Sequence, residues 1–268
     1  MKKYIYYGEE YKPKYKYPLT STPSNWKELE SKVAHVLSHC GCEVEIDKTI
    51  GIARGSTEFD VYAIVNDKYK AVCICECKYW NHKVNQDVID SFRTRLIDIG
   101  ANLGIVISKE GFQSGCYEKI KFTNIKLFNF NEFLEFYEED YLLSRAKEIS
   151  ISSIDLHHYS SPMKCFYDGE LNKKTDEVKE KIIKLMCKND MFTRATFSMG
   201  MCENNPYMYF DNLIEFYKDE GLDFTTYEEL CDYTINRLKT NLKQIDDLFG
   251  IPLRTHDWKK QHIENIGI

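Results

Sequence analysis

The chain has 268 residues, of which 43% are apolar and 29% charged, a composition that excludes a mainly disordered protein. The length allows one large domain or two small ones. The net charge of −6 argues against non-specific coating of nucleic acid, but it is compatible with an acidic site beside a local basic surface. No apolar run reaches the length of a secretory signal or a membrane span, so we expect a cytoplasmic protein with reduced thiols and no membrane partner.

Hydrophobic periodicity and capping residues predict the elements of the first half. Residues 1–23, rich in Tyr, Lys and Pro, are expected to form an irregular arm. Ser24 or Asn25 then caps a helix that ends at Gly41, whose apolar residues, from Trp26 to Leu37, are expected to be buried. The next elements are a strand (42–51), a glycine-containing loop (51–57), a strand (58–65), a turn at Asn66–Asp67 and its hairpin partner (69–80).

Helices and short buried strands are predicted to alternate in the next part of the chain. A helix ending at Gly100, a strand (103–108), a helix from Ser114, a strand (125–130) and a helix (131–149) follow in that order. The first strands follow one another as hairpins, and the later strands alternate with helices. This order predicts an α/β fold with a mixed sheet that is flanked by helices on both faces. Residues 150–164 look polar and turn-rich, and the remaining sequence is mainly helical. We therefore predict an α/β domain over residues 24–145 and a mostly helical C-terminal domain over residues 146–268.

The cysteines lack the spacing of a zinc site. Cys73, Cys75 and Cys77 alternate along an apolar stretch, whereas the common zinc motif leaves two residues between its cysteines so that the chain can turn around the metal. Alternate residues of a strand point to one face, so we expect three small buried side chains. Cys40 and Cys42 are equally unsuited to zinc.

Two acidic residues and a lysine are predicted to meet on neighbouring strands. Asp60 lies in the middle of its strand, and Glu76 and Lys78 share one face of the hairpin partner. Pairing about the turn would bring Asp60 close to Glu76 if the register of the two strands is suitable. Two such carboxylates repel each other unless a cation is present, and Mg²⁺ binds through one or two carboxylates together with substrate phosphate. Lys78 could then hold or activate an attacking water or neutralise charge in the transition state.

This arrangement resembles the PD-(D/E)xK nuclease superfamily, and within it the Mrr-like (type IV) restriction endonucleases. The matching stretches are WKELESKVAHVLSHCGCEVE, GIARGSTEFDVYA, CICECKYW and LGIVISKEGFQSGCYEKI. The resemblance implies an active site of Glu30, Asp60, Glu76 and Lys78. It also implies that Asp60, Glu76 and the backbone carbonyl of Cys77 bind the metal, which would be Mg²⁺ or alternatively Mn²⁺.

Two residues depart from the pattern of the family, and some of the proposed active-site residues also allow a purely structural interpretation. Phe59 stands where proline is common among relatives, and Glu76 stands where many Mrr-like members have Gln. Glu76 and Lys78 could instead form a simple ion pair on a solvated strand face. Glu30 could merely mark the edge of the apolar stripe of its helix.

A second group of residues is expected at the mouth of the site, where aromatic and basic side chains suit contact with nucleic acid. These candidates are Arg54, Tyr79, Trp80, His82 and Lys83. The alternative is an ordinary surface loop. Asn85 is expected to cap the helix that follows, and Arg93 and Arg95 on that helix are expected to be solvated.

The sequence thus predicts a Mg²⁺-dependent endonuclease that hydrolyses phosphodiester bonds in DNA, and the resemblance suits a role in antiviral defence. The C-terminal domain would select the substrate or regulate cutting, and cutting of both strands would favour a homodimer. Three alternatives stay open. One is a catalytically inactive nucleic-acid sensor on the same fold, and another is an RNase, because the same metal chemistry cuts both backbones. The third is a purely protein-interacting domain, which the acidic pI allows.

Overall fold

A computed structural model describes residues 5–6, 9–52, 55–66, 68–160, 168–201, 205–250 and 263–264. The chain divides into two compact units. One unit is formed by residues 18–141, and the other by residues 1–17 together with residues 142–268.

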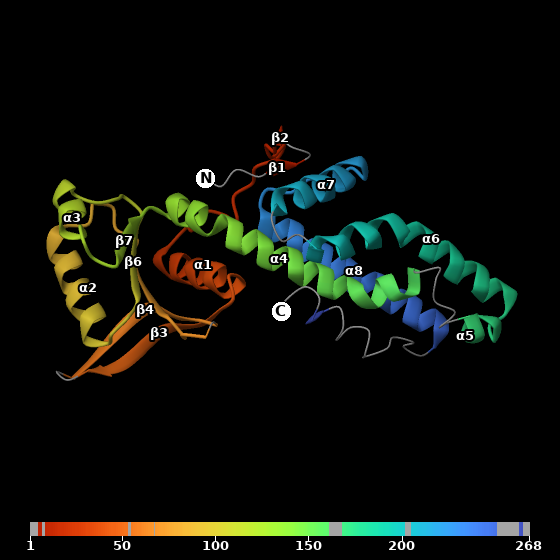
Figure 1. The fold of residues 1–268 in the computed structure, drawn as a ribbon, viewed down its shortest axis with the longest axis horizontal. Helices are drawn as coiled ribbons and strands as arrows, with labels where there is room; N and C mark the ends of the chain where they lie inside the picture. Colours follow the sequence, from red (N-terminus) through yellow and green to blue (C-terminus); the bar gives the residue numbers. More distant parts are fainter. Residues whose placement is uncertain are drawn as a thin grey trace. The chain divides into compact units, whose positions relative to one another are not determined.

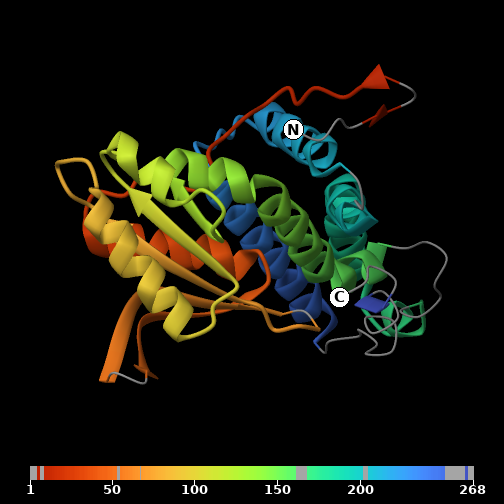
Figure 2. The same cartoon turned by 60° about the vertical axis from the view of Figure 1, so that its left-hand side comes forward.

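The unit of residues 18–141 is built on a five-stranded mixed sheet with the strand order β3-β4-β5-β6-β7. The strands are β3 Cys42–Ile52, β4 Gly55–Val65, β5 Val72–Lys78, β6 Leu103–Ser108 and β7 Ile125–Phe128. The first three strands pair antiparallel, and β5, β6 and β7 pair parallel. Helix α1 (Trp26–His39) covers one face of the sheet, and α2 (Gln86–Asp98) and α3 (Ser114–Lys119) cover the other (Figures 1 and 2). The predicted mixed sheet with helices on both faces is confirmed.

Helix α1 forms where the sequence predicts it. The side chain of Asn25 accepts a hydrogen bond from the backbone N–H of Glu28 at 3.0 Å, and Gly41 follows the helix with a φ of 84°. Val33 and the other aliphatic residues of the stripe are buried, but Trp26 is 52% exposed, so the expectation for Trp26 was wrong. Periodicity assigns a residue to a face of a helix, but it does not say how much of that face the sheet covers.

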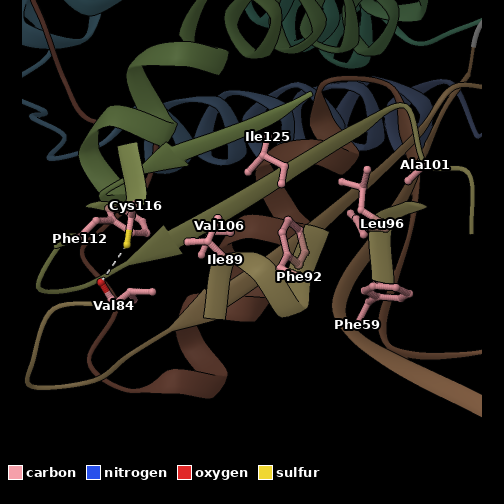
Figure 3. Packing of buried hydrophobic residues seen from close by; sticks show 11 residues of the cluster. Phe59, Val84, Ile89, Phe92, Leu96, Ala101, Val106, Phe112, Cys116 and Ile125 are labelled. Atoms are coloured by element: carbon pink, nitrogen blue, oxygen red, sulfur yellow. Dashed lines mark hydrogen bonds between the residues drawn. The ribbon is translucent and has the colours of Figure 1, made fainter. Parts of the chain in front are cut away.

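The core between the sheet and α2 is an apolar cluster with Phe92 near its middle (Figure 3). Its fully buried members include Ile74 of β5, Phe92 of α2 and Val106 of β6. Gly104 of β6 allows the close approach of α2, because a Cβ atom there would lie 2.2 Å from a methyl carbon of Leu96. The thiol of Cys116 donates to the carbonyl of Val84 at the edge of this cluster.

Strict strand alternation fails next to the predicted site. Phe59 packs in the same cluster as Ile74 and Phe92, whereas alternation placed it on the opposite face, with Val61. The ladder between β3 and β4 skips the Asp47–Asp60 pair, and Asp47 has a φ of 54°. The strand is irregular at this point, so side chains on either side of Asp60 leave the simple two-residue period.

The connections around β4 also differ from the prediction. The pairs Gly51–Ser56 and Ile52–Gly55 extend the β3–β4 hairpin into the predicted loop of residues 51–57. The connection from β4 to β5 runs from residue 66 to residue 71 and is longer than a two-residue turn. The length of each of these two connections is decided by the cross-strand pairing, which local turn signals do not reveal.

The other unit is helical in its described C-terminal part, as predicted. After α4 (Phe130–Ser160), which continues from the first unit, the elements are α5 Asp168–Asn172, α6 Asp176–Ser198, the short helix η1 Met199–Met201, α7 Pro206–Asp219 and α8 Tyr227–Phe249. Strands β1 (Ile5–Tyr6) and β2 (Glu9–Glu10) form a small ladder. None of the helices within the described ranges is both long and apolar enough to cross a membrane.

The prediction of a turn-rich segment after residue 149 was wrong, because α4 continues through it to Ser160. Ile154 and Tyr159 are buried in this part of the helix, at 1% and 0% exposure. The hydroxyl of Ser150 donates to the carbonyl of Phe197 at 2.7 Å. Tertiary burial therefore outweighs the low helix propensity of its serines.

The N-terminal arm contacts α7 within this unit. The buried carboxylate of Asp211 accepts hydrogen bonds from the backbone N–H groups of Lys14 and Tyr15, at 2.8 and 3.1 Å, and from the hydroxyl of Tyr11. The hydroxyl of Tyr227 in α8 donates to the carbonyl of Tyr15 at 3.2 Å. Residues 11–15 are therefore an ordered part of the helical unit.

Candidate active site

Asp60 lies where β4 and β5 stop pairing. The ladder between the two strands ends at Val61 and Cys75, and beyond it the backbone N–H of Cys77 donates to Oδ2 of Asp60 at 2.6 Å. The N–H and C=O groups of one strand residue point to the same side. The carbonyl of Cys77 therefore faces the same edge of β5 as the Asp60 carboxylate.

Glu76 is buried and faces two cationic side chains. It is 6% exposed, and its carboxylate lies 2.6 Å from Nζ of Lys78 and 2.9 Å from Nη2 of Arg95. Glu76 and Lys78 do form the ion pair that a purely structural interpretation expects, but it lies on a buried face of the strand and not on a solvated one. A buried carboxylate with two partners has a fixed position, unlike one on an open surface.

Glu30 enters the same electrostatic environment from α1. It is 7% exposed, and its burial, followed by the negative charges of Asp60 and Asp47, raises its pKa from 4.5 to about 7. Burial and the charge of Glu76 also raise the pKa of Asp60, although the hydrogen bond from Cys77 opposes this shift. The acidic groups of the predicted set are therefore electrostatically coupled.

Arg95 is the residue that the sequence analysis missed, because it was expected to be solvated. Besides its ion pair with Glu76, its Nη1 donates to the backbone carbonyl of Glu58 at 3.0 Å. Its guanidinium carbon lies 5.4 Å from the ring centroid of Phe59 and 5.7 Å from that of Phe92. A signal was present in the sequence, since a residue three positions after Phe92 lies on the same, buried face of α2.

The predicted nucleic-acid contacts occupy the segment directly after β5. The rings of Trp80 and His82 stack with centroids 5.1 Å apart, and Nζ of Lys78 lies 5.5 Å from the Trp80 ring. Trp80, His82 and Lys83 are exposed, whereas Tyr79 is partly buried. Arg54 lies outside the described residues. Asn85 caps α2 as expected, with its side chain accepting from the N–H of Val88 at 3.3 Å.

The buried cysteines of β5 do not contribute a thiolate site. Cys73, Cys75 and Cys77 are 4%, 0% and 7% exposed, in agreement with the expectation that they are buried. Burial raises the pKa of the Cys77 thiol well above its ordinary value, and the carboxylates of Asp60 and Glu30 raise it further. The Cys77 thiol therefore stays protonated in the folded domain.

The donor set beside Asp60 suits a hard divalent cation. A carboxylate and a backbone carbonyl are the oxygen ligands that Mg²⁺ and Mn²⁺ accept, and a cation there would relieve the charge repulsion that raises the pKa of Asp60. No group of three His, Cys, Asp or Glu side chains in the described parts of the chain could hold a metal by itself. A cation beside Asp60 would take its remaining ligands from water or substrate.

The comparison with protein families agrees with this geometry. Residues 23–137 match the sequence model of the Mrr catalytic domain, described as a restriction endonuclease. These residues form a restriction-endonuclease domain of the Mrr-like branch of the PD-(D/E)xK superfamily. The match covers less than half of the chain and leaves the helical unit unassigned.

Curated proteins gave no match, whereas solved structures gave distant ones. The chain is 14% identical to a protein of unknown function, AF1548, over 84% of this chain and 99% of the other, with a TM-score of 0.37. It is 13% identical to a repair endonuclease from Pyrococcus abyssi, over 42% and 50% of the two chains, with a TM-score of 0.31. The chain in a DrdV–DNA complex is 13% identical, over 89% and 25%, with a TM-score of 0.21.

Proposed function

We propose that the chain is a metal-dependent endonuclease that hydrolyses phosphodiester bonds in DNA. The observation that carries the proposal is the meeting of Asp60, the Cys77 backbone and the Glu76–Lys78 pair at the point where β4 and β5 separate. A nuclease domain has a use for such a group of charges, whereas a purely structural site would leave the repulsion between Asp60 and Glu76 without purpose.

Asp60, Glu76 and the carbonyl of Cys77 would hold Mg²⁺, with Mn²⁺ as an alternative. The bound cation supplies a Lewis acid for the phosphate and lowers the pKa of bound water. Lys78 contacts Oε1 of Glu76 and Arg95 contacts Oε2, and each oxygen keeps a further lone pair that could coordinate the cation. These two cationic partners also limit the net negative charge of the site.

Lys78 is the residue that we assign to the attacking water. Its side chain is 17% exposed and its ammonium group is paired with Glu76, so it could donate to a water or to the scissile phosphate at the edge of β5. In the reaction the attacking water loses one proton to a base as its oxygen bonds to phosphorus, the bond to the leaving sugar oxygen breaks, and that oxygen takes up one proton from solvent. With a pKa of about 7, Glu30 can exchange a proton at neutral pH and assists from α1.

Arg95 would act as a positioning residue for Glu76. Its planar guanidinium is fixed by the carbonyl of Glu58 and by the rings of Phe59 and Phe92. The guanidinium of Arg95, fixed in this way, holds the Glu76 carboxylate at the edge of the sheet. It is not expected to touch the substrate.

The exposed segment after β5 would contact DNA. The stacked pair of Trp80 and His82 offers an aromatic surface, and Lys83 adds a positive charge. We also propose that the helical unit selects the substrate or regulates cutting. Cutting of both strands would favour a homodimer, and defence against foreign DNA is the biological setting that the family suggests.

Cleavage assays with a matched pair of lysine variants test this function. Lys78→Met removes the ammonium group but retains most of the side-chain length, and Lys121→Met makes the same change at an exposed lysine that pairs with Glu118 in another part of the domain. Supercoiled plasmid, single-stranded DNA and RNA are incubated with each protein in Mg²⁺, Mn²⁺ or EDTA. Circular dichroism checks that the variants fold.

We expect wild type and Lys121→Met to cut DNA with Mg²⁺ or Mn²⁺, EDTA to prevent cutting, and Lys78→Met to lose at least about 100-fold in rate. Cutting of RNA alone would establish the RNase alternative. Tight binding of nucleic acid without any cutting would favour the inactive sensor. Full activity of folded Lys78→Met would refute the assignment of this site.

A further inference from the structure

A pocket that the proposed hydrolysis does not use lies beside the candidate site. Its volume is about 480 Å³, and all of the residues that define it belong to the restriction-endonuclease unit. Leu29 and Tyr79 form part of its wall, and they are the immediate sequence neighbours of Glu30 and Lys78. The pocket and the candidate site are therefore built on the same two segments, the start of α1 and the end of β5.

The aromatic wall of the pocket is fixed before any ligand binds. The hydroxyl of Tyr79 donates to the backbone carbonyl of Pro23 at 3.1 Å, and Nζ of Lys109 lies 4.9 Å from the centroid of its ring. Phe130, the first residue of α4, adds a second ring. Fixed aromatic and apolar walls suit a flat ligand, because little side-chain freedom is lost on binding.

The charges around the pocket exclude a phosphate as the preferred occupant. Among the described residues that line it, Glu132 and Glu135 are acidic, and Lys109 is the only basic one. Lys109 already donates to the side-chain oxygen of Asn81 at 2.7 Å. Two carboxylates repel an anion but can accept hydrogen bonds from amino groups. One oxygen of Glu132 already accepts from the backbone N–H of Asn129 at 2.7 Å, which leaves its other oxygen and Glu135 for a ligand. The amide of Asn131 adds both a donor and an acceptor.

We propose that this pocket receives one unstacked nucleobase that carries an exocyclic amino group, as cytosine and adenine do. The base would stack against Tyr79 or Phe130, and a carboxylate of Glu132 or Glu135 would accept from its amino group. The volume is within the range of pockets that enclose small organic groups. The inference rests on the proposed function, and it adds a preference for the base next to the bond that is cut.

Binding of three single-stranded probes of equal length tests the proposal with the full chain in EDTA, so that cutting does not interfere. The probes are oligodeoxycytidine, oligodeoxythymidine and an abasic chain, and fluorescence anisotropy gives the Kd of each. Asn131→Trp fills the pocket, and Glu135→Ala removes an acceptor. Ile97→Trp is the control, because it adds similar bulk at an exposed position of α2 that does not line the pocket.

We expect wild type and Ile97→Trp to bind oligodeoxycytidine about five-fold or more tightly than oligodeoxythymidine, and the abasic chain most weakly. Asn131→Trp and Glu135→Ala should bring the two pyrimidine probes to nearly equal Kd. Equal binding of all three probes by wild type would overturn the inference, as would a base preference that survives in both pocket variants. If the chain still cuts DNA in those cases, the proposed function stands; if it neither binds nor cuts nucleic acid, both fail.

Discussion

Replacement of Glu30 by glutamine should stabilise the restriction-endonuclease unit at high pH when no metal is present. The pKa of the Glu30 carboxyl is about 7 in the folded chain against an ordinary value of 4.5. Between these two values the unfolded chain releases a proton that the folded chain retains, so the free energy of unfolding falls as the pH rises. The decrease is complete above pH 7 and amounts to at most about 3 kcal/mol.

Urea unfolding in EDTA, followed by tryptophan fluorescence, measures this effect. Trp26 and Trp80 lie in the unit of interest, and Trp258 is replaced by Phe in every protein compared. The advantage of Glu30→Gln over Glu30 should grow by about 1–3 kcal/mol between pH 5 and pH 8. Glutamine cannot ionise, so the free energy of unfolding of the variant lacks this decrease with rising pH.

Glu28 on the same helix provides a control of opposite sign. The hydroxyl and backbone N–H of Ser24 donate to its carboxylate and lower its pKa. The ionised form of Glu28 therefore contributes stability above its unfolded pKa, and Glu28→Gln should be less stable than wild type at pH 8. If Glu30→Gln has the same advantage at pH 5 and pH 8, the burial of an acid with a raised pKa is refuted.

Two further substitutions test contacts that only the folded chain reveals. Arg95→Gln should slow DNA cutting by about ten-fold or more, because Glu76 loses its fixed partner. Arg95→Lys should retain only part of the wild-type rate, since an ammonium group cannot make the same planar contacts. Exposed Arg93→Gln is the control, and equal cutting rates for the two glutamine variants would exclude the positioning role. Asp211→Ala should destabilise the helical unit by about 2–4 kcal/mol, because the N–H groups of the arm lose their acceptor. Thermal unfolding compared with exposed Asp219→Ala measures this loss, and similar melting temperatures for the two variants would contradict it.

The sequence by itself determined the elements of the restriction-endonuclease unit and the hairpin of β4 and β5, whereas the register that brings Asp60 near Glu76 was fixed only in the folded sheet. Capping residues such as Asn25 and Asn85 act on their own helix, and apolar periods report which side of an element is buried. These are local signals, so one sequence is enough to recognise them. The association of Lys78 with Glu76 follows from the same two-residue period of a strand.

Tertiary structure alone decided the features that depend on distant parts of the chain. Arg95 reaches Glu76 because α2 packs closely on the sheet, and the raised pKa of Glu30 depends on burial against β4 and β5. The extension of α4 to Ser160 and the attachment of the arm to Asp211 likewise depend on partners far along the chain. Burial and charge are summed over neighbours in space, and their sum is fixed only when the chain has folded.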